Sequence, residues 1–179
     1  MTVRRRTVLQ SAAGLALASF AKTTEAAEPS ATAQPGDFDF LTGEWKIANR
    51  QLKQNGDWIT FDGEATVTSI LGGLVSVEEL RIPARDFSGM GLRVLDVEKA
   101  VWNDFWVNAK SGVLGSEGVP GVFKGGAGIF DSPDADNPAT IWRGVWDQIA
   151  PDSHRWYQAV SKDSGKTWQQ TWTMEWTRA

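Results

Sequence analysis

The chain of 179 residues contains no cysteine, one histidine and one tyrosine. Without cysteine there can be no disulfide, no thiolate nucleophile and no covalent haem attachment. A single histidine excludes a multi-histidine zinc site, and the residues predict neither a metal nor another cofactor. A serine–histidine–aspartate triad would have to use His154, and no G-x-S-x-G motif supplies its serine.

Long apolar runs and basic clusters are also scarce. The apolar stretch from Val8 to Phe20 is too short and too weakly hydrophobic to cross a bilayer, so we expect no stable membrane insertion. The formal charge of −4 includes +3 in residues 1–27, from four basic side chains and one acidic one, which leaves −7 for the rest. An acidic domain without a basic run argues against nucleic acid and anionic membranes as partners.

The basic residues that are present gather at the start of the chain. The segment Arg4-Arg5-Arg6-Thr7-Val8-Leu9-Gln10 resembles a twin-arginine export signal, and small residues that suit cleavage follow the apolar stretch. We predict a signal peptide over residues 1–27, a linker with little to bury over 28–35, and one folded domain over 36–179. This resemblance implies a periplasmic or secreted protein.

Ten tryptophans alternate with polar residues along short segments. In residues 168–178, three tryptophans and a methionine share one face of a strand, and polar residues share the other. About ten such segments are separated by turn residues, and no stretch beyond residue 27 has a convincing helical period. The pattern predicts an all-β fold, an antiparallel up-and-down β-barrel or a sandwich.

The turn before the last strand has its own signature. Ser161 to Trp168 fits S-x-D-x-G-x-T-W, which resembles the Asp-box hairpin. Asp163 can accept backbone N–H groups, and Gly165 can adopt positive φ. A sialidase-like propeller would need several copies, and the chain has one, so we expect a stable hairpin. Ser164 replaces the usual glycine, and we expect that exchange to cost little.

Both ends of the predicted domain carry a further resemblance. Residues 37–45 read DFDFLTGEW and residues 172–178 read WTMEWTR, which resembles a bacterial family of lipocalin-like domains of unknown function, often exported. Gly43-x-Trp45 near the start with Arg178 near the end is similar to the calycin barrels. There the tryptophan closes one end of the barrel and the arginine lies across it. The resemblance implies a lipocalin-like barrel of about ten strands, and it implies fold much more than activity.

The tryptophan-bearing faces of three strands are expected to point inward, where aromatic walls with a few polar groups would form a small-molecule cavity. A packed core with polar residues at its rim is the alternative. In the opposite register Arg143 points inward and would anchor a carboxylate or phosphate; otherwise it lies on the outer surface. The predicted ligand-binding residues are Trp102, Trp106, Trp142, Arg143, Trp146, Trp156 and Gln158.

Three functions follow as hypotheses. The first is binding of a small apolar or aromatic molecule inside the barrel. The second is a metal-independent isomerase, lyase or hydrolase in the same barrel. His154 would titrate near neutral pH as the acid and base, and Asp104 would orient its imidazole or stabilise its charge. Alternatively His154 is a solvated rim residue, and Arg143 with Glu78 is the next candidate pair. The third is carbohydrate binding by exposed tryptophan faces.

Overall fold

The computed structural model of the protein describes residues 32–179. The predicted signal peptide and the first half of the predicted linker lie outside the described residues. Within the described part of the chain, no helix is both long enough and apolar enough to span a membrane.

Ten strands follow one another in an antiparallel meander, and each pairs with the next. The first strand also pairs with the last, so the sheet closes into a barrel. The predicted all-β, lipocalin-like up-and-down barrel of about ten strands is thereby confirmed. The strands are β1 (Gly43–Leu52), β2 (Trp58–Ile70), β3 (Val75–Ile82), β4 (Phe87–Asp96), β5 (Val101–Asn108), β6 (Val119–Lys124), β7 (Ala127–Pro133), β8 (Ile141–Ala150), β9 (Ser153–Ser161) and β10 (Gln169–Arg178).

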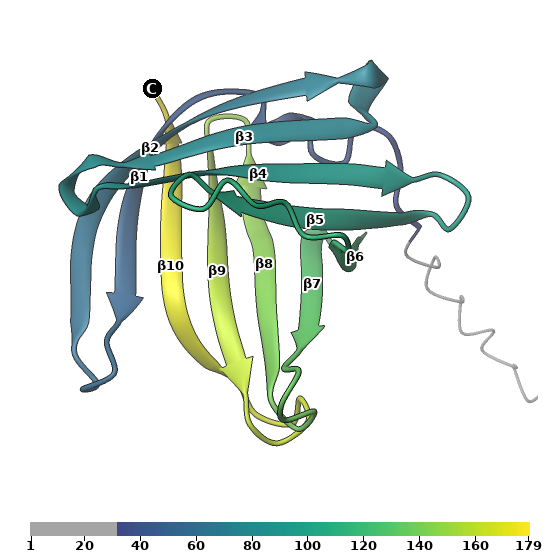
Figure 1. Cartoon of the computed structure of the whole chain (residues 1–179). Coiled ribbons are helices and arrows are strands. Elements are labelled where there is room, and N and C mark those ends of the chain that lie inside the picture. Colours follow the sequence, from purple (N-terminus) through teal and green to yellow (C-terminus); the bar gives the residue numbers. More distant parts are fainter. Residues whose placement is uncertain (1–31) are drawn as a thin grey trace, which may run out of the picture. The chain divides into compact units, whose positions relative to one another are not determined.

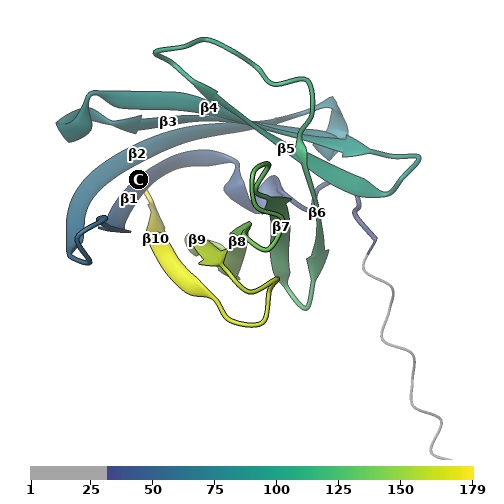
Figure 2. The ribbon, with the colours of Figure 1, turned by 60° about the horizontal axis from the view of Figure 1, so that its bottom comes forward.

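The barrel is flattened rather than round. In Figure 1 strands β3–β5 run across the view and strands β7–β10 run down it, so two layers of strands cross at a steep angle. Figure 2, turned to bring the lower end forward, shows the strands curving around a common interior. Short 3-10 turns lie at η1 (Asp39–Leu41), η2 (Leu71–Gly73) and η3 (Pro83–Arg85).

The ladder between β5 and β6 is the shortest in the barrel. It joins three residue pairs, from Trp102–Gly121 to Asp104–Val119, whereas β5 pairs with β4 along the whole length of β5. The second half of β5 is therefore held by β4 alone. Residues 109–118, which follow it, form a loop on which Val113 and Leu114 are exposed.

One end of the barrel is closed by packed aromatic side chains. Trp45 is buried there and donates its indole N–H to the carbonyl oxygen of Leu41 at 2.6 Å. The guanidinium of Arg178 lies 4.3 Å above the Trp45 ring and donates to the carbonyl oxygens of Thr42 and Pro151. The predicted contact between Trp45 and Arg178 is confirmed. It seals this end with a cation–π contact and two satisfied carbonyl groups.

The segment that precedes β1 packs against the same end. Ala33 is buried, and its N–H donates to the carbonyl oxygen of Ala100 at 3.2 Å. Asp37 accepts the indole N–H of Trp102 at 3.0 Å, and Phe38 packs edge-on against that indole. Among residues 32–179, packing against the barrel therefore already includes Ala33, three residues before Gly36.

The hairpin between β9 and β10 has the geometry that its sequence predicts. Asp163 accepts the backbone N–H and the hydroxyl of Thr167 at 2.9 and 2.7 Å, and the Trp168 indole donates to Gly165. The two bonds from Thr167, together with one from the Ser161 hydroxyl, hold the pKa of Asp163 at about 2, below its ordinary value. Ser164 has φ +58°, a left-handed conformation that costs a residue with a Cβ about 1 kcal/mol. Ser164 therefore lowers the stability of the hairpin more than the sequence alone suggests.

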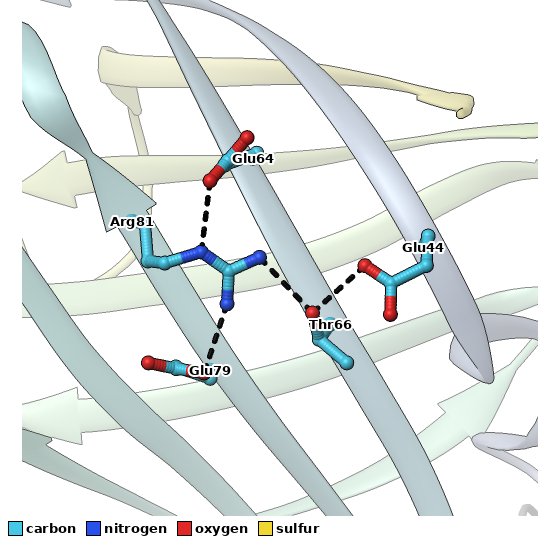
Figure 3. A network of polar contacts seen from close by, with 5 residues as sticks. All are labelled: Glu44, Glu64, Thr66, Glu79 and Arg81. Atoms are coloured by element: carbon cyan, nitrogen blue, oxygen red, sulfur yellow. Dashed lines mark hydrogen bonds and ion pairs between the residues drawn. The ribbon is translucent and has the colours of Figure 1, made fainter.

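The outer face of β1–β3 carries a polar network (Figure 3). Arg81 pairs with Glu64 at 2.9 Å and with Glu79 at 2.8 Å, and it also donates to Thr66, which bonds Glu44. These side chains are largely solvated, so each pair contributes little stability. Their arrangement shows that Glu79 points away from the barrel interior.

A tryptophan-lined cavity as the candidate functional site

The barrel encloses a cavity of about 350 Å³. Its lining comes from six strands: β3, β4, β5, β8, β9 and β10. Aromatic and aliphatic side chains make most of the wall, and four polar side chains interrupt it. The lining residues are Glu78, Leu80, Phe87, Gly91, Arg93, Asp104, Phe105, Trp106, Trp146, Trp156, Gln158, Trp172, Met174 and Trp176.

The aromatic rings of the wall are held by one another and by small neighbours. Trp156 and Trp172 meet edge to face with centroids 6.0 Å apart, and Phe87 stacks on Trp106 at the same distance. Trp106 can lie across β4 because residue 89 is glycine: a Cβ there would collide with the indole. Trp106 remains 43% exposed, so it stands where the cavity meets solvent.

Three charged side chains lie together on adjacent strands. Arg93 of β4 donates to the Glu78 carboxylate of β3 at 2.7 Å, and both side chains are about 95% buried. The Nε atom of Arg93 lies 3.5 Å from a carboxylate oxygen of Asp104 on β5. The guanidinium also lies 4.8 Å from the Trp146 ring centroid. Glu78 and Arg93 thus form a buried ion pair, with Asp104 as a third, more open member.

Asp104 is the titratable group of the cavity whose pKa matters near neutrality. Burial raises the pKa of Asp104 to about 6; Arg93 opposes that rise and Glu78 adds to it. Its side chain is nevertheless 30% exposed. None of the hydrogen bonds among residues 32–179 ends on its carboxylate. The carboxylate therefore faces the cavity with acceptor capacity to spare.

His154 lies outside the cavity lining, at the closed end. It is 2% exposed and packs against Trp45, Trp176 and Phe40, with ring centroids 4.4, 4.9 and 5.2 Å away. Neither ring nitrogen has a hydrogen-bond partner in the described part of the chain. Burial first, and then Arg93 and Arg178, lower the pKa of His154 to about 3.

The predicted behaviour of His154 needs correction. It was expected to titrate near neutral pH beside Asp104, or to be a solvated rim residue, and it is an enclosed neutral imidazole. The groups that shift its pKa do not include Asp104, and those that shift the pKa of Asp104 do not include His154. The aromatic packing around the imidazole explains the difference, because it removes water without offering a hydrogen-bond partner.

The predicted ligand-binding residues fall into two groups. Trp106, Trp146, Trp156 and Gln158 line the cavity. Trp102 is buried at the closed end, bonded to Asp37, and Trp142 is 39% exposed and stands outside the lining.

Arg143 adopts the outward alternative. It makes two hydrogen bonds of 2.6 Å to Asp131 and lies 3.9 Å over the Trp168 ring. Alternation along β8 explains this position, because Trp146 is the inward residue and Arg143 lies on the opposite face. The inward arginine of this barrel is Arg93.

Sequence reasoning named Asp104 and Glu78 as candidates but missed Arg93, which joins them, because β4 buries its less apolar face. Its buried positions are Gly89, Gly91, Arg93 and Leu95, while the apolar Met90, Leu92 and Val94 alternate with them. The period-two pattern alone favours the apolar set as the inner face. The available signal was the pair of glycines, since small residues make room for a large side chain such as Trp106 on the neighbouring strand.

Comparison with known proteins supports the fold. No protein-family model and no curated protein matches this chain. Among the solved structures that are similar to this chain, each at low sequence identity, we report three. They are a protein of unknown function of the DUF3598 family from Nostoc punctiforme (11% identity, TM-score 0.51, 83% of this chain and 50% of that one), Rv2717c from M. tuberculosis (12%, 0.49, 82% and 99%) and the S-type phycobiliprotein lyase CPES from Guillardia theta (9%, 0.51, 79% and 90%). The chain spans about half the length of the Nostoc protein.

Proposed function

We propose that the protein binds a small apolar or aromatic molecule inside its barrel. The observation that carries this proposal is the cavity of about 350 Å³ with tryptophans from four strands in its wall. That volume lies within the range of about 300–1,000 Å³ of small-molecule sites. Apolar area leaving water on binding would supply the affinity, at about 25 cal/mol per Å² before ordering costs.

Carbohydrate binding has less support, because sugar platforms need open indole faces, and two of the three exposed tryptophans among residues 32–179 have a ring face covered. Trp58 is partly exposed, but the Arg50 guanidinium covers its ring at 4.4 Å. Phe87 stacks on one face of Trp106. Acid–base catalysis has also lost its expected pair, since His154 is enclosed and neutral while Asp104 has Arg93 and Glu78 beside it. Binding is the function that the cavity supports best.

Replacing a wall residue tests the site. Trp156→Ala is expected to weaken calorimetric binding of the neutral probe 3-methylindole by about tenfold, because one indole face leaves the wall. Trp142→Ala is the matched control: it removes a tryptophan that is outside the lining, and affinity should stay within about twofold. Absent saturable binding, or equal losses in both variants, would contradict the proposal.

We further propose that the protein works outside the cytoplasm as an exported member of the lipocalin-like domains that it resembles. The support is the Arg5-Arg6 pair, the apolar stretch and the small residues that follow. Arg5→Lys with Arg6→Lys should hold the protein in the cytoplasmic fraction of its host, whereas Arg4→Lys should leave export intact. Unchanged export of the double variant would refute a twin-arginine route.

A further inference from the structure

The charges that line the cavity do not balance. Glu78 and Arg93 neutralise each other at 2.7 Å, and both side chains are enclosed. Asp104 adds a second carboxylate without a second cation, and its distance of 3.5 Å from the Arg93 Nε atom is longer than a good charge-assisted hydrogen bond. When Asp104 is ionised, the cavity therefore holds one net negative charge, located on its most open polar group.

Arg93 is poorly placed to receive an anionic ligand. Its Nε and Nη1 atoms are buried and have no hydrogen-bond partner among residues 32–179. The guanidinium lies against the rings of Trp146 and Phe38, at 4.8 and 5.3 Å. A carboxylate entering the cavity would meet the Asp104 oxygens before it reached a free N–H of Arg93, and like charges repel in such a site.

The aromatic wall favours the opposite charge. Indole and phenyl faces carry negative electrostatic potential, and they attract cations that come within about 6 Å. Trp106, Trp156 and Trp172 surround the same space into which Asp104 opens. An organic ammonium loses its hydration when it leaves water. A carboxylate beside several aromatic faces compensates that loss with an ion pair, a hydrogen-bond acceptor and cation–π contacts.

We infer that the cavity, if it binds small molecules as proposed above, selects aromatic molecules that carry a protonated amine, with Asp104 as the acceptor. The aromatic part of the ligand packs between the tryptophans of the wall. Its ammonium donates to the Asp104 carboxylate, which has no other hydrogen-bond donor in the described structure. The positive charge of Arg93, 3.5 Å away on β4, favours the ionised form of that carboxylate.

The pH dependence follows from the groups around Asp104. Arg93 on β4 and Glu78 on β3 are the charged groups that shift its pKa, and the rest of β5 is uncharged. Of the other strands, β6 presents Val119 and carries Lys124 at its far end. The outward pair Arg143–Asp131 joins β8 to β7, and the outward pair Arg155–Asp147 joins β9 to β8. His154 on β9 is neutral, and β10 carries Glu175 and Arg178. An alkyl ammonium stays protonated up to a pH of about 10. Amine affinity should therefore rise as pH increases through about 6, where Asp104 ionises, and level off above it.

Three probes that share one ring system test the inference by calorimetry at pH 8: tryptamine, neutral 3-methylindole and indole-3-acetate. The native protein should bind tryptamine at least about tenfold more tightly than 3-methylindole, and indole-3-acetate more weakly than either. Asp104→Asn should abolish the advantage of the amine and leave 3-methylindole within about twofold. Glu79→Gln removes one negative charge on the outer face, at the residue next to Glu78 (Figure 3). It should preserve the tighter binding of tryptamine over 3-methylindole.

Each possible failure has a distinct meaning. If 3-methylindole binds and tryptamine gains nothing over it, or if Asp104→Asn retains the gain, the amine inference is overturned and the binding function stands. If indole-3-acetate binds best, the cavity selects anions and the inference is overturned in sign. If none of the three probes binds to the native protein, the proposed function falls together with the inference.

Discussion

Glu78→Gln is expected to lower the free energy of unfolding by about 3–5 kcal/mol, because it leaves the Arg93 guanidinium buried without its main counter-ion. The two side chains are joined at 2.7 Å and are almost fully enclosed. Asp104, at 3.5 Å, offers partial compensation, which places the expected loss toward the lower end of that range. Denaturant unfolding at pH 7.5, monitored by tryptophan emission, measures the change.

Two further variants separate the ion pair from general charge effects. Glu79→Gln is one residue away and removes a solvated partner of Arg81, so it should cost less than about 1 kcal/mol. Glu78→Met combined with Arg93→Met replaces the pair by apolar groups and should recover much of the loss. A cost below about 1 kcal/mol for Glu78→Gln would show that the buried Arg93 charge does not depend on Glu78 for its compensation.

The second large effect is expected in acid. In the unfolded chain His154 is protonated below a pH of about 6.5, whereas in the folded protein its pKa is lowered to about 3. The unfolded state therefore gains stability relative to the folded state as pH falls through this window, by about 1.4 kcal/mol per pH unit. His154→Phe removes the group and keeps an aromatic ring. Its stability relative to the native protein should rise by about 2–3 kcal/mol between pH 7.5 and pH 4.5.

Asp104 acts in the opposite direction, which is why the comparison must be made between variants. Its pKa is raised from the ordinary value of 3.8 to about 6 in the folded protein, so the folded protein binds this proton more tightly than the unfolded chain does. The resulting stabilisation is complete below pH 3.8 and is lost as pH rises to about 6. The two groups partly cancel in the native protein. Denaturant midpoints of the native protein, His154→Phe and Asp104→Asn at both pH values resolve them. Parallel profiles for the native protein and His154→Phe would show that the imidazole is not held neutral by the fold.

The period-two alternation of the strands and the turns rich in glycine, asparagine and proline predicted an all-β fold, a barrel or a sandwich. The resemblance to lipocalin-like domains then favoured the barrel. The same resemblance implied the contact of Trp45 with Arg178. The S-x-D-x-G-x-T-W motif predicted the bonds of the Asp163 hairpin, since a short motif of this kind has a fixed geometry. The inward faces of β5, β8 and β9 followed from their tryptophans. These patterns did not predict how far each side chain is enclosed. Trp142 lies on the same face of β8 as Trp146 but is partly exposed and outside the cavity lining.

The inward position of Arg93 between Glu78 and Asp104, and the state of His154, required the three-dimensional structure. Arg93 lies on a strand whose more apolar face is the outer one, so alternation predicts the wrong side. His154 is enclosed partly by Phe40, which belongs to the segment before β1 and is more than a hundred residues away in sequence. No local spacing reports a contact between segments so distant, and that contact decides whether water reaches the imidazole.

The three-pair ladder between β5 and β6 has a consequence for how this protein meets other copies of itself. If this seam, the three residue pairs between β5 and β6, loses its hydrogen bonds, the closed barrel becomes an open sheet with two free edges. Free edges of a sheet can pair with strands of another chain. Pro120 sits in the middle of the seam, opposite Asn103. Because proline has no N–H, it limits the strength of the seam, and the same lack deprives an incoming strand of a donor. The residue that weakens the closure of the barrel thus also protects its exposed edge.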